Sequence, residues 1–290
     1  MNILKEFDLA IVKTEGTTNG YRLEERIFDS YLSNQNWEKH LAGMSQEHRR
    51  QYGAGSGGEL EEQHGRPPKM ASFASSSRMI YNLSKDVLGF VFEKQLTTVL
   101  GGIANLDGYV EREGNCIFVE AKCREPYSHT AIQNIKQNYK PIYAYLREKM
   151  PRVFSCVMED IPESEYMRVV FFCRGDSEVY FDIKQMICHL LAVANEMLSR
   201  DSDGSVLFLY LLYNPTELPV AEERKCELLR MYEDTCKSAK GYRFAEMYGH
   251  ILDFLVQRSG MDVDEHRLHQ LKESFCFALC DQNDYLKYLE

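Results

Sequence analysis

The sequence predicts an α/β protein with a central mixed β-sheet flanked by helices. Two short apolar segments, 104–112 and 116–125, are separated by a turn at 113–115 and read as neighbouring strands. Apolar residues recur at helical spacing on both sides of these segments. A run of apolar residues at 206–213 has the length of a buried strand. Strands and helices in this order favour a sheet with helices packed on its faces.

The other elements follow from apolar periodicity and from glycine and proline. The glycine-rich stretch at 53–60 and the proline- and serine-containing stretch after it predict an ordered loop. Pro141 predicts a kink, or a division into two helices, inside a helical segment. Strands are expected at 168–173 and from 178, and helices at 21–41, 78–100, 128–149, 183–199, 221–258 (with a break near Lys240–Gly241) and 264–289.

The chain of 290 residues fits one large domain with helical additions. We expect an N-terminal helix and ordered loop over 1–77. A core follows over 78–215, with an insertion at about 128–176. The C-terminal helical region, 216–290, is expected to pack on this core.

Composition limits the class of protein. Hydrophobic residues make up 44% of the chain, but no apolar run approaches the roughly 18 residues of a membrane span. The N-terminal residues contain acids and no small-residue cleavage site, so no signal peptide is expected. The nine cysteines are odd in number and form no Cys-x-x-Cys pair, which favours buried, reduced thiols and a cytoplasmic location.

The charge is unevenly distributed. The formal net charge of −10 argues against tight nonspecific binding of nucleic acid by this chain alone. Residues 78–150 are slightly basic, whereas the acids concentrate in 151–290. The acidic C-terminal region therefore suits a protein partner better than DNA.

The predicted strand at 116–125 contains the candidate catalytic residues. In the segment 116–125, alternation places Glu120 and Lys122 on the same face as Phe118. Burying both charges in an apolar strand costs free energy unless they have partners. A divalent cation is one such partner, with Asp107 of the preceding strand as a second carboxylate. These two carboxylates and the backbone carbonyl of Ala121 would suit Mg²⁺, while Lys122 could orient a water molecule or stabilise charge on a phosphate.

These residues resemble the PD-(D/E)XK nuclease superfamily, which includes many restriction endonucleases. The motifs are Leu-Asp-Gly at 106–108, Val-Glu-Ala-Lys at 119–122 and Phe-Glu-Lys at 92–94. The resemblance covers about 78–215 and implies a restriction-endonuclease-like core of order αβββαβ. It also implies a metal-dependent endonuclease that hydrolyses phosphodiester bonds in DNA with Mg²⁺, or Mn²⁺ in its place.

The resemblance implies a supporting role at the site for two further residues, and the sequence departs from the superfamily pattern at two points. Glu93 matches an acid that the superfamily often places on the helix before the motif, and Gln185 matches a glutamine on the helix after it. Leu106 stands where the name of the superfamily has proline, and the insertion after the motif strand is long.

Substrate contacts are expected around this core. Backbone N–H groups at a helix start favour anions, so Ser76, Ser77 and Arg78 are candidate phosphate contacts. A serine there can also be a simple N-cap. Lys69 in the loop and Arg124 at the end of the motif strand are further candidates, and Glu59 could approach the site.

Alternatives stay open for each of these assignments. Glu120 and Lys122 could form a buried structural ion pair without a metal, Glu93 could be a solvated residue, and Gln185 could bridge or cap helices. His189 has no second ligand at metal spacing and is expected to be structural. The alternative functions are a noncatalytic nucleic-acid-binding or protein-assembly module of the same fold, or an unrelated α/β protein. Neither DNA versus RNA nor a homodimer is decided by the sequence.

Overall fold

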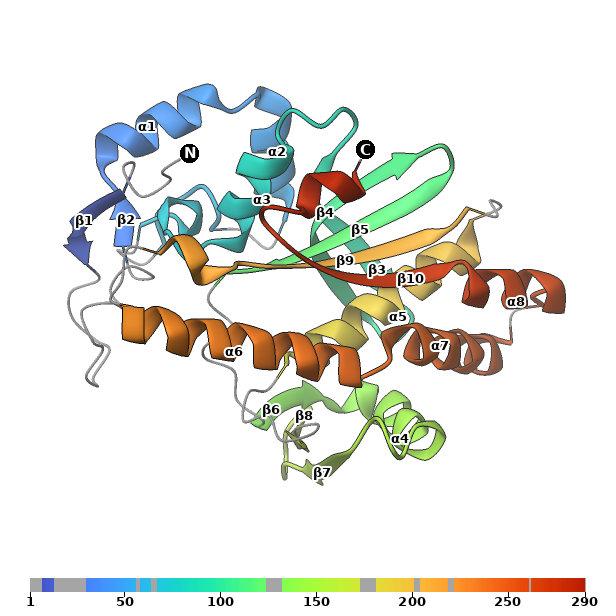
Figure 1. Ribbon diagram of the computed structural model, residues 1–290. Helices are drawn as coiled ribbons and strands as arrows, with labels where there is room; N and C mark the ends of the chain where they lie inside the picture. The colour runs from blue at the N-terminus through green and yellow to red at the C-terminus, as the bar shows by residue number, and fades with distance from the viewer. Residues whose placement is uncertain are drawn as a thin grey trace.

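The computed structural model describes residues 7–12, 30–55, 58–63, 67–123, 132–172, 181–200, 204–218, 222–260 and 262–289 (Figure 1). Its centre is a five-stranded sheet made of β3 (Val91–Thr98), β4 (Gly102–Arg112), β5 (Asn115–Lys122), β9 (Val206–Leu212) and β10 (Phe275–Asp281). The strand order is β10-β9-β5-β4-β3. β3, β4 and β5 pair antiparallel, whereas β5, β9 and β10 pair parallel. The expected α/β class with a mixed central sheet is confirmed.

Helices cover both faces of this sheet. The bounds in the described residues are α1 (Asn34–Gly43), α2 (Gln46–Ala54), α3 (Ser76–Ser84), α4 (Lys140–Lys149), α5 (Ile183–Ser199), α6 (Glu222–Gly241), α7 (Phe244–Ser259) and α8 (Glu265–Glu273). Short 3-10 segments are η3 (Lys69–Ala71), η5 (Gln137–Tyr139), η6 (Pro215–Glu217) and η7 (Tyr285–Tyr288). α5 and α7 contribute to the core on one face together with Phe118 and Phe208. α3 contributes to the core on the other face together with Val119 and Leu209.

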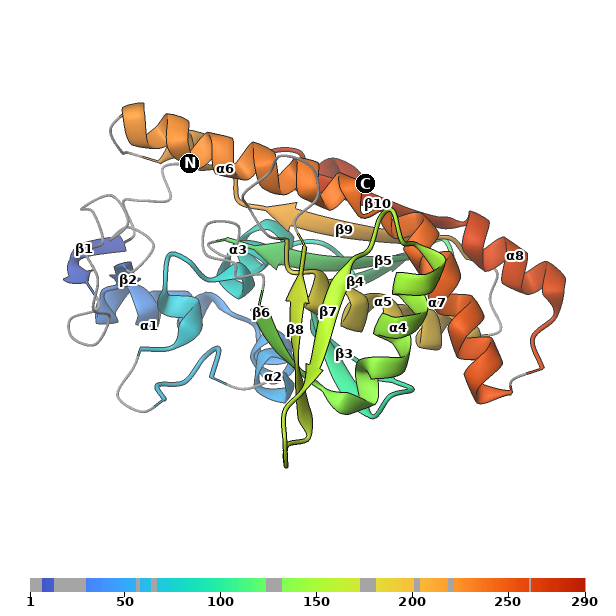
Figure 2. The ribbon, with the colours of Figure 1, turned by 90° about the horizontal axis from the view of Figure 1, so that it is seen from below.

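A second, smaller sheet lies between β5 and α5 in the sequence. Its strands β6 (Ile132–Lys136), β7 (Cys156–Asp160) and β8 (Tyr166–Phe171) pair antiparallel in the order β6-β8-β7. The buried Met167 and Val169 of β8 join Leu146 of α4 in the core on the α5 face. In Figure 1 the small sheet and α4 lie on the opposite side of the large sheet from α3, and Figure 2 shows them facing the viewer from below. A separate pair, β1 (Phe7–Val12) and β2 (Ser30–Leu32), precedes α1.

Two expected helical regions, the expected hairpin and the expected strand at 206–213 agree with the structure. α5 spans the predicted range 183–199, and Asp182 caps it by accepting a hydrogen bond from the Gln185 N–H at 3.0 Å. The predicted helical region at 221–258 is helical from Glu222 onward, with a break after Gly241. The hairpin β4–β5 and the strand β9 occur where the apolar runs predicted them. No helix in the described ranges combines the length and apolarity needed to cross a membrane.

The predicted helix over 78–100 is wrong in its second half. α3 ends at Ser84, and after a turn the chain continues as β3. Val91 and Phe92 are residue types that favour strands, and they pair with Tyr109 and Gly108 of β4. The helical spacing of the apolar residues was therefore compatible with either element.

Other expected helices are also replaced by strands. Ser30–Leu32 is a strand inside the predicted helix 21–41, and Ile132–Lys136 is a strand inside the predicted helix 128–149. Pro141 lies in the first turn of α4, where proline fits a helix, so it begins the helix and does not kink it. The predicted helical region 264–289 contains α8, but its apolar run at 275–281 is the edge strand β10. Residues 178–180 of the predicted strand lie outside the described residues, and α5 begins at Ile183.

Candidate active site

Side-chain alternation is interrupted in two neighbouring strands, and this irregularity positions two acids. In β3, Phe92 and Leu96 are four residues apart but belong to cores on opposite faces. In β4, Leu106 and Tyr109 are three residues apart but belong to the same core. Glu93 lies at the first interruption with a φ of 51°. Such a left-handed conformation costs a non-glycine residue about 1–3 kcal/mol, and strained residues of this kind cluster at functional sites.

Asp107 lies at the second interruption, beside Glu93. Phe92 pairs with Gly108 and Lys94 pairs with Leu106, so Glu93 and Asp107 are opposite each other on neighbouring strands. The β4–β5 pairing begins at Gly108 and Val119. Immediately beyond it, the Asp107 carboxylate accepts the Ala121 N–H at 2.7 Å. The carboxylate of Asp107 is therefore fixed at the point where β4 and β5 separate.

The two charged residues of β5 lie on the α5 face of the sheet. Glu120 and Lys122 alternate with Val119 and Ala121, which belong to the core on the α3 face. Their side chains form an ion pair, with 2.6 Å between Lys122 Nζ and Glu120 Oε1 and side-chain exposures of only 7% and 2%. A buried pair of this kind requires further polar partners to offset the loss of hydration.

Helix α5 supplies such partners. Gln185 Nε2 donates to Glu120 Oε1 at 2.8 Å. One helical turn later, His189 Nδ1 lies 3.3 Å from Glu120 Oε2. Burial, followed by the nearby Lys122 ammonium, lowers the pKa of His189 to about 3. His189 is thus a neutral imidazole at physiological pH.

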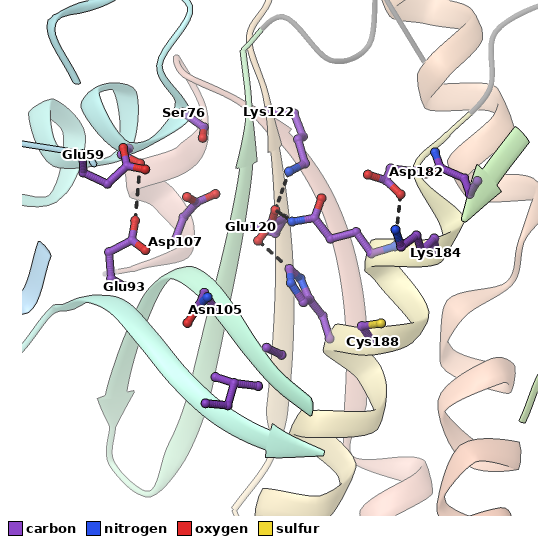
Figure 3. Close-up of a pocket in the computed structure, with 16 residues that line it drawn as sticks. Glu59, Ser76, Glu93, Asn105, Asp107, Glu120, Lys122, Asp182, Lys184 and Cys188 are labelled. Carbon is purple, nitrogen blue, oxygen red and sulfur yellow. Dashed lines mark hydrogen bonds and ion pairs between the residues drawn. The ribbon is translucent and has the colours of Figure 1, made fainter. Parts of the chain in front are cut away.

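These side chains line one cavity of about 460 Å³. Figure 3 shows Glu59, Glu93 and Asp107 on one side of the cavity, Asp182 and Lys184 on the other, and Glu120 between them. Among the predicted site residues, the cavity brings together Ser76, Ser77, Glu93, Asp107, Glu120, Lys122 and Gln185. The sequence therefore correctly predicted that residues of β4, β5 and α5 come together at one site.

Glu93 reaches the cavity from β3 and not from a helix, so its predicted position on a helix is wrong. Its Oε1 accepts a hydrogen bond from Ser77 Oγ at 3.3 Å. Burial, then the charges of Asp107 and Glu59, raise the pKa of Glu93 to about 8. Glu93 therefore retains its proton through most of the neutral range in the metal-free protein.

The glycine-rich loop packs against this carboxyl group. A Cβ atom at Gly55 would lie 2.8 Å from Glu93 Oε2, so only glycine leaves room there without displacing the side chain. Backbone hydrogen bonds from Lys69 N to Gly58 O and from Met70 N to Glu59 O hold the following segment. This pairing places the buried Glu59 on the cavity wall.

Some predicted contacts lie elsewhere. The Lys69 side chain is 58% exposed and pairs with Glu59 at 3.0 Å, but it does not line the cavity. Arg78 is buried and lines a different pocket with Phe73 and Cys123. Ala121 is fully buried outside the cavity lining, and its carbonyl remains a predicted ligand. Arg124 lies outside the described residues.

The sequence did not identify every residue of the wall. His189, Lys184 and Asp182 were not selected as site residues, although all three line the cavity. The four-residue spacing of Gln185 and His189 on an apolar helix was the available signal, because that spacing places both on one helix face. Lys184 Nζ donates a hydrogen bond to Asn134 O at 3.0 Å and so joins α5 to β6. This contact between distant segments could not be recognised from the sequence alone.

Two carboxylates of the cavity, those of Asp107 and Glu120, are candidate oxygen donors for a divalent cation. Among the residues that the structure describes, no three His, Cys, Asp or Glu side chains form a group that could hold a metal. Mg²⁺ commonly binds through one or two carboxylates, several waters and substrate phosphates. Asp107 and Glu120 supply oxygen donors of that kind from adjacent strands. Any ion held by these two carboxylates would need its remaining ligands from water or substrate.

Comparisons with protein-family models, with curated proteins and with solved structures give no match for this chain.

Proposed function

We propose that this protein is a divalent-cation-dependent endonuclease that hydrolyses phosphodiester bonds in DNA. The observation that carries the proposal is the convergence of Asp107, Glu120, Lys122 and Gln185 on one cavity. These are the residues through which the sequence resembles the PD-(D/E)XK superfamily. The order α3, β3, β4, β5, α5, β9, with β6, α4, β7 and β8 inserted between β5 and α5, also supports the proposal, because the resemblance implies an αβββαβ core with an insertion after the motif strand.

Asp107 and Glu120 are the residues assigned to hold Mg²⁺, with Mn²⁺ as an alternative. A bound divalent cation supplies Lewis acidity toward a phosphate oxygen and lowers the pKa of water. Asp107 is anchored by the Ala121 N–H, and Glu120 is anchored by Gln185 and Lys122. Anchoring of this kind keeps the two carboxylates oriented before substrate arrives.

We assign charge stabilisation to Lys122 and proton transfer to Glu93. The Lys122 ammonium can neutralise charge that develops on a phosphate oxygen, and electrostatic stabilisation of this kind is usually the largest single contribution to catalysis. Glu93, with its pKa near 8, can donate or accept a proton close to neutral pH. Ser76 and Ser77 lie on the cavity wall at the N-terminus of α3, where backbone N–H groups favour phosphate.

A plasmid-nicking assay tests the proposal. Purified full-length protein is incubated with supercoiled plasmid and Mg²⁺, Mn²⁺ or EDTA. We expect cleavage that depends on the cation and that falls by about 10²-fold or more in Asp107→Asn, Glu120→Gln and Lys122→Met, because each removes a charged group from the reacting centre. Glu113→Gln is the matched control, because this exposed acid lies in the turn of the same β4–β5 hairpin. Cleavage that survives all three site substitutions would reject the proposal.

A noncatalytic module of the same fold is the second candidate. The favouring observation is the ion pair of Glu120 and Lys122, in which the two charges compensate each other. The acidic C-terminal region, whose helix α6 begins with Glu222 and Glu223, suits a protein partner for such a module. Calorimetry that detects no Mg²⁺ or Mn²⁺ binding at millimolar concentration, together with no cleavage, would favour this candidate over the nuclease.

A further inference from the structure

Helix α5 presents two side chains to the same carboxylate. Gln185 and His189 are one helical turn apart, and they face different oxygens of Glu120: Gln185 Nε2 is 2.8 Å from Oε1, and His189 Nδ1 is 3.3 Å from Oε2. Lys122 Nζ shares Oε1 at 2.6 Å. The two oxygens of Glu120 are therefore approached by different residues, and His189 is the one that α5 places at Oε2.

The His189 ring is fixed in this position by its surroundings. It is only 3% exposed, and its centroid is 6.4 Å from that of Phe208 on β9. Its Nδ1 makes no full hydrogen bond within the described ranges, so the nearby Glu120 oxygen is the polar group available to it. A small rotation of the carboxylate or the ring would complete a hydrogen bond from Nδ1–H to Oε2.

A glutamate side chain has three rotatable bonds, so hydrogen bonds to one oxygen leave the direction of the other poorly fixed. A donor at each oxygen removes this freedom. Carboxylates that bind metal ions are generally hydrogen-bonded in this way, and loss of such outer partners typically weakens metal affinity by about 10- to 100-fold. The contact between His189 and Oε2 thus has a consequence that packing of a buried ring alone would not have.

We propose that His189 is a positioning residue that holds the Glu120 carboxylate, through Nδ1–H and Oε2, in the orientation needed to bind a divalent cation. This inference rests on the proposed function, because it assumes that Glu120 is a cation ligand. It adds to the motif a residue that acts through Glu120.

Two substitutions separate positioning from packing. Asparagine places its side-chain amide near the position of Nδ1, so His189→Asn keeps a donor for Oε2. His189→Leu keeps apolar bulk but removes the donor. Met186→Leu is the matched control, because Met186 is buried on the same helix and does not line the cavity. Thermal unfolding in EDTA verifies that each variant is folded before its affinity is compared.

Mn²⁺ binding to the full chain, measured by electron paramagnetic resonance, is the first readout. We expect His189→Leu to weaken Mn²⁺ binding by about 10- to 100-fold, and His189→Asn and Met186→Leu to remain within about threefold of the wild type. Equal Mn²⁺ affinity of folded His189→Leu and wild type would overturn the inference and leave the proposed function standing.

The second readout does not need a metal. Long-range ¹H–¹⁵N spectra of the metal-free protein report which ring nitrogen carries the proton, and Glu120→Gln should shift the Nδ1 resonance. A proton found on Nε2 alone would also overturn the inference. If the wild type binds no Mn²⁺, the proposed function fails and this inference fails with it, even where Nδ1–H responds to Glu120→Gln.

Discussion

Replacing Glu93 with glutamine should change how the stability of the protein depends on pH. The pKa of Glu93 is raised from 4.5 to about 8, first by burial and then by Asp107 and Glu59. In the unfolded chain this carboxyl group ionises near its ordinary value, while the folded protein still keeps it protonated. Between these two pKa values the folded state therefore binds more protons, so the free energy of unfolding falls as pH rises.

The size of the effect follows from the shift. One pKa unit corresponds to about 1.4 kcal/mol, so the full shift corresponds to an upper limit of about 5 kcal/mol. This loss begins near pH 4.5 and is complete once the pH exceeds about 8. In Glu93→Gln the side chain stays neutral at every pH and keeps an oxygen that can accept a hydrogen bond from Ser77 Oγ. The unfolding free energy of this variant should therefore not fall with pH for this reason.

Urea denaturation between pH 5 and pH 9 in EDTA measures this pH-dependent loss of unfolding free energy. We expect the free energy of unfolding of the wild type to drop more steeply than that of Glu93→Gln, with the difference growing to several kcal/mol by pH 9. The exposed Glu113, changed to glutamine, should follow the wild type. Parallel pH profiles for the wild type and Glu93→Gln would refute the assignment of a raised pKa to this group.

Two further predictions concern packing. A Cβ atom at Gly108 would lie 2.2 Å from the ring of Phe90, so Gly108→Ala should lower the free energy of unfolding by about 1–3 kcal/mol; an unchanged urea midpoint would contradict this contact. Ser84 Oγ and Tyr285 Oη are both buried and lie 2.8 Å apart, so Tyr285→Phe should cost about 1–3 kcal/mol by leaving the serine without this partner. Adding Ser84→Ala to Tyr285→Phe should recover most of that loss in the same denaturation assay. A double variant that is no more stable than Tyr285→Phe would contradict the assignment of the loss to an unpaired serine.

The parts of the fold that the sequence predicted are those set by local pattern. Helix α5 has a helical apolar stripe and Asp182 as its N-cap, and both signals are contained in its own residues. The hairpin β4–β5 has a two-residue turn at Glu113 and Gly114, both with positive φ. Its alternating side chains predicted that Glu120 and Lys122 would share a face, and they do.

The parts that the sequence could not predict depend on pairing between distant segments. The run that forms β10 is short and apolar, and such a run is equally compatible with a buried helix. It becomes a strand because β9 offers a parallel partner about seventy residues earlier in the chain, from Val206 to Leu212. In the same way, the interruption of alternation at Glu93 depends on β4, so the position of this acid in the site was predicted but its secondary structure was not.

The last strand of the sheet has a consequence for synthesis. β9 is internal to the sheet, and one of its two neighbours is β10, which leaves the ribosome only after α6, α7 and α8. Because domains generally fold as units, β9 cannot complete its pairing in the sheet until β10 has been synthesised. Until then the edge of β9 that pairs with β10 is open to association with other polypeptides, and a premature stop before Phe275 would leave that edge permanently open.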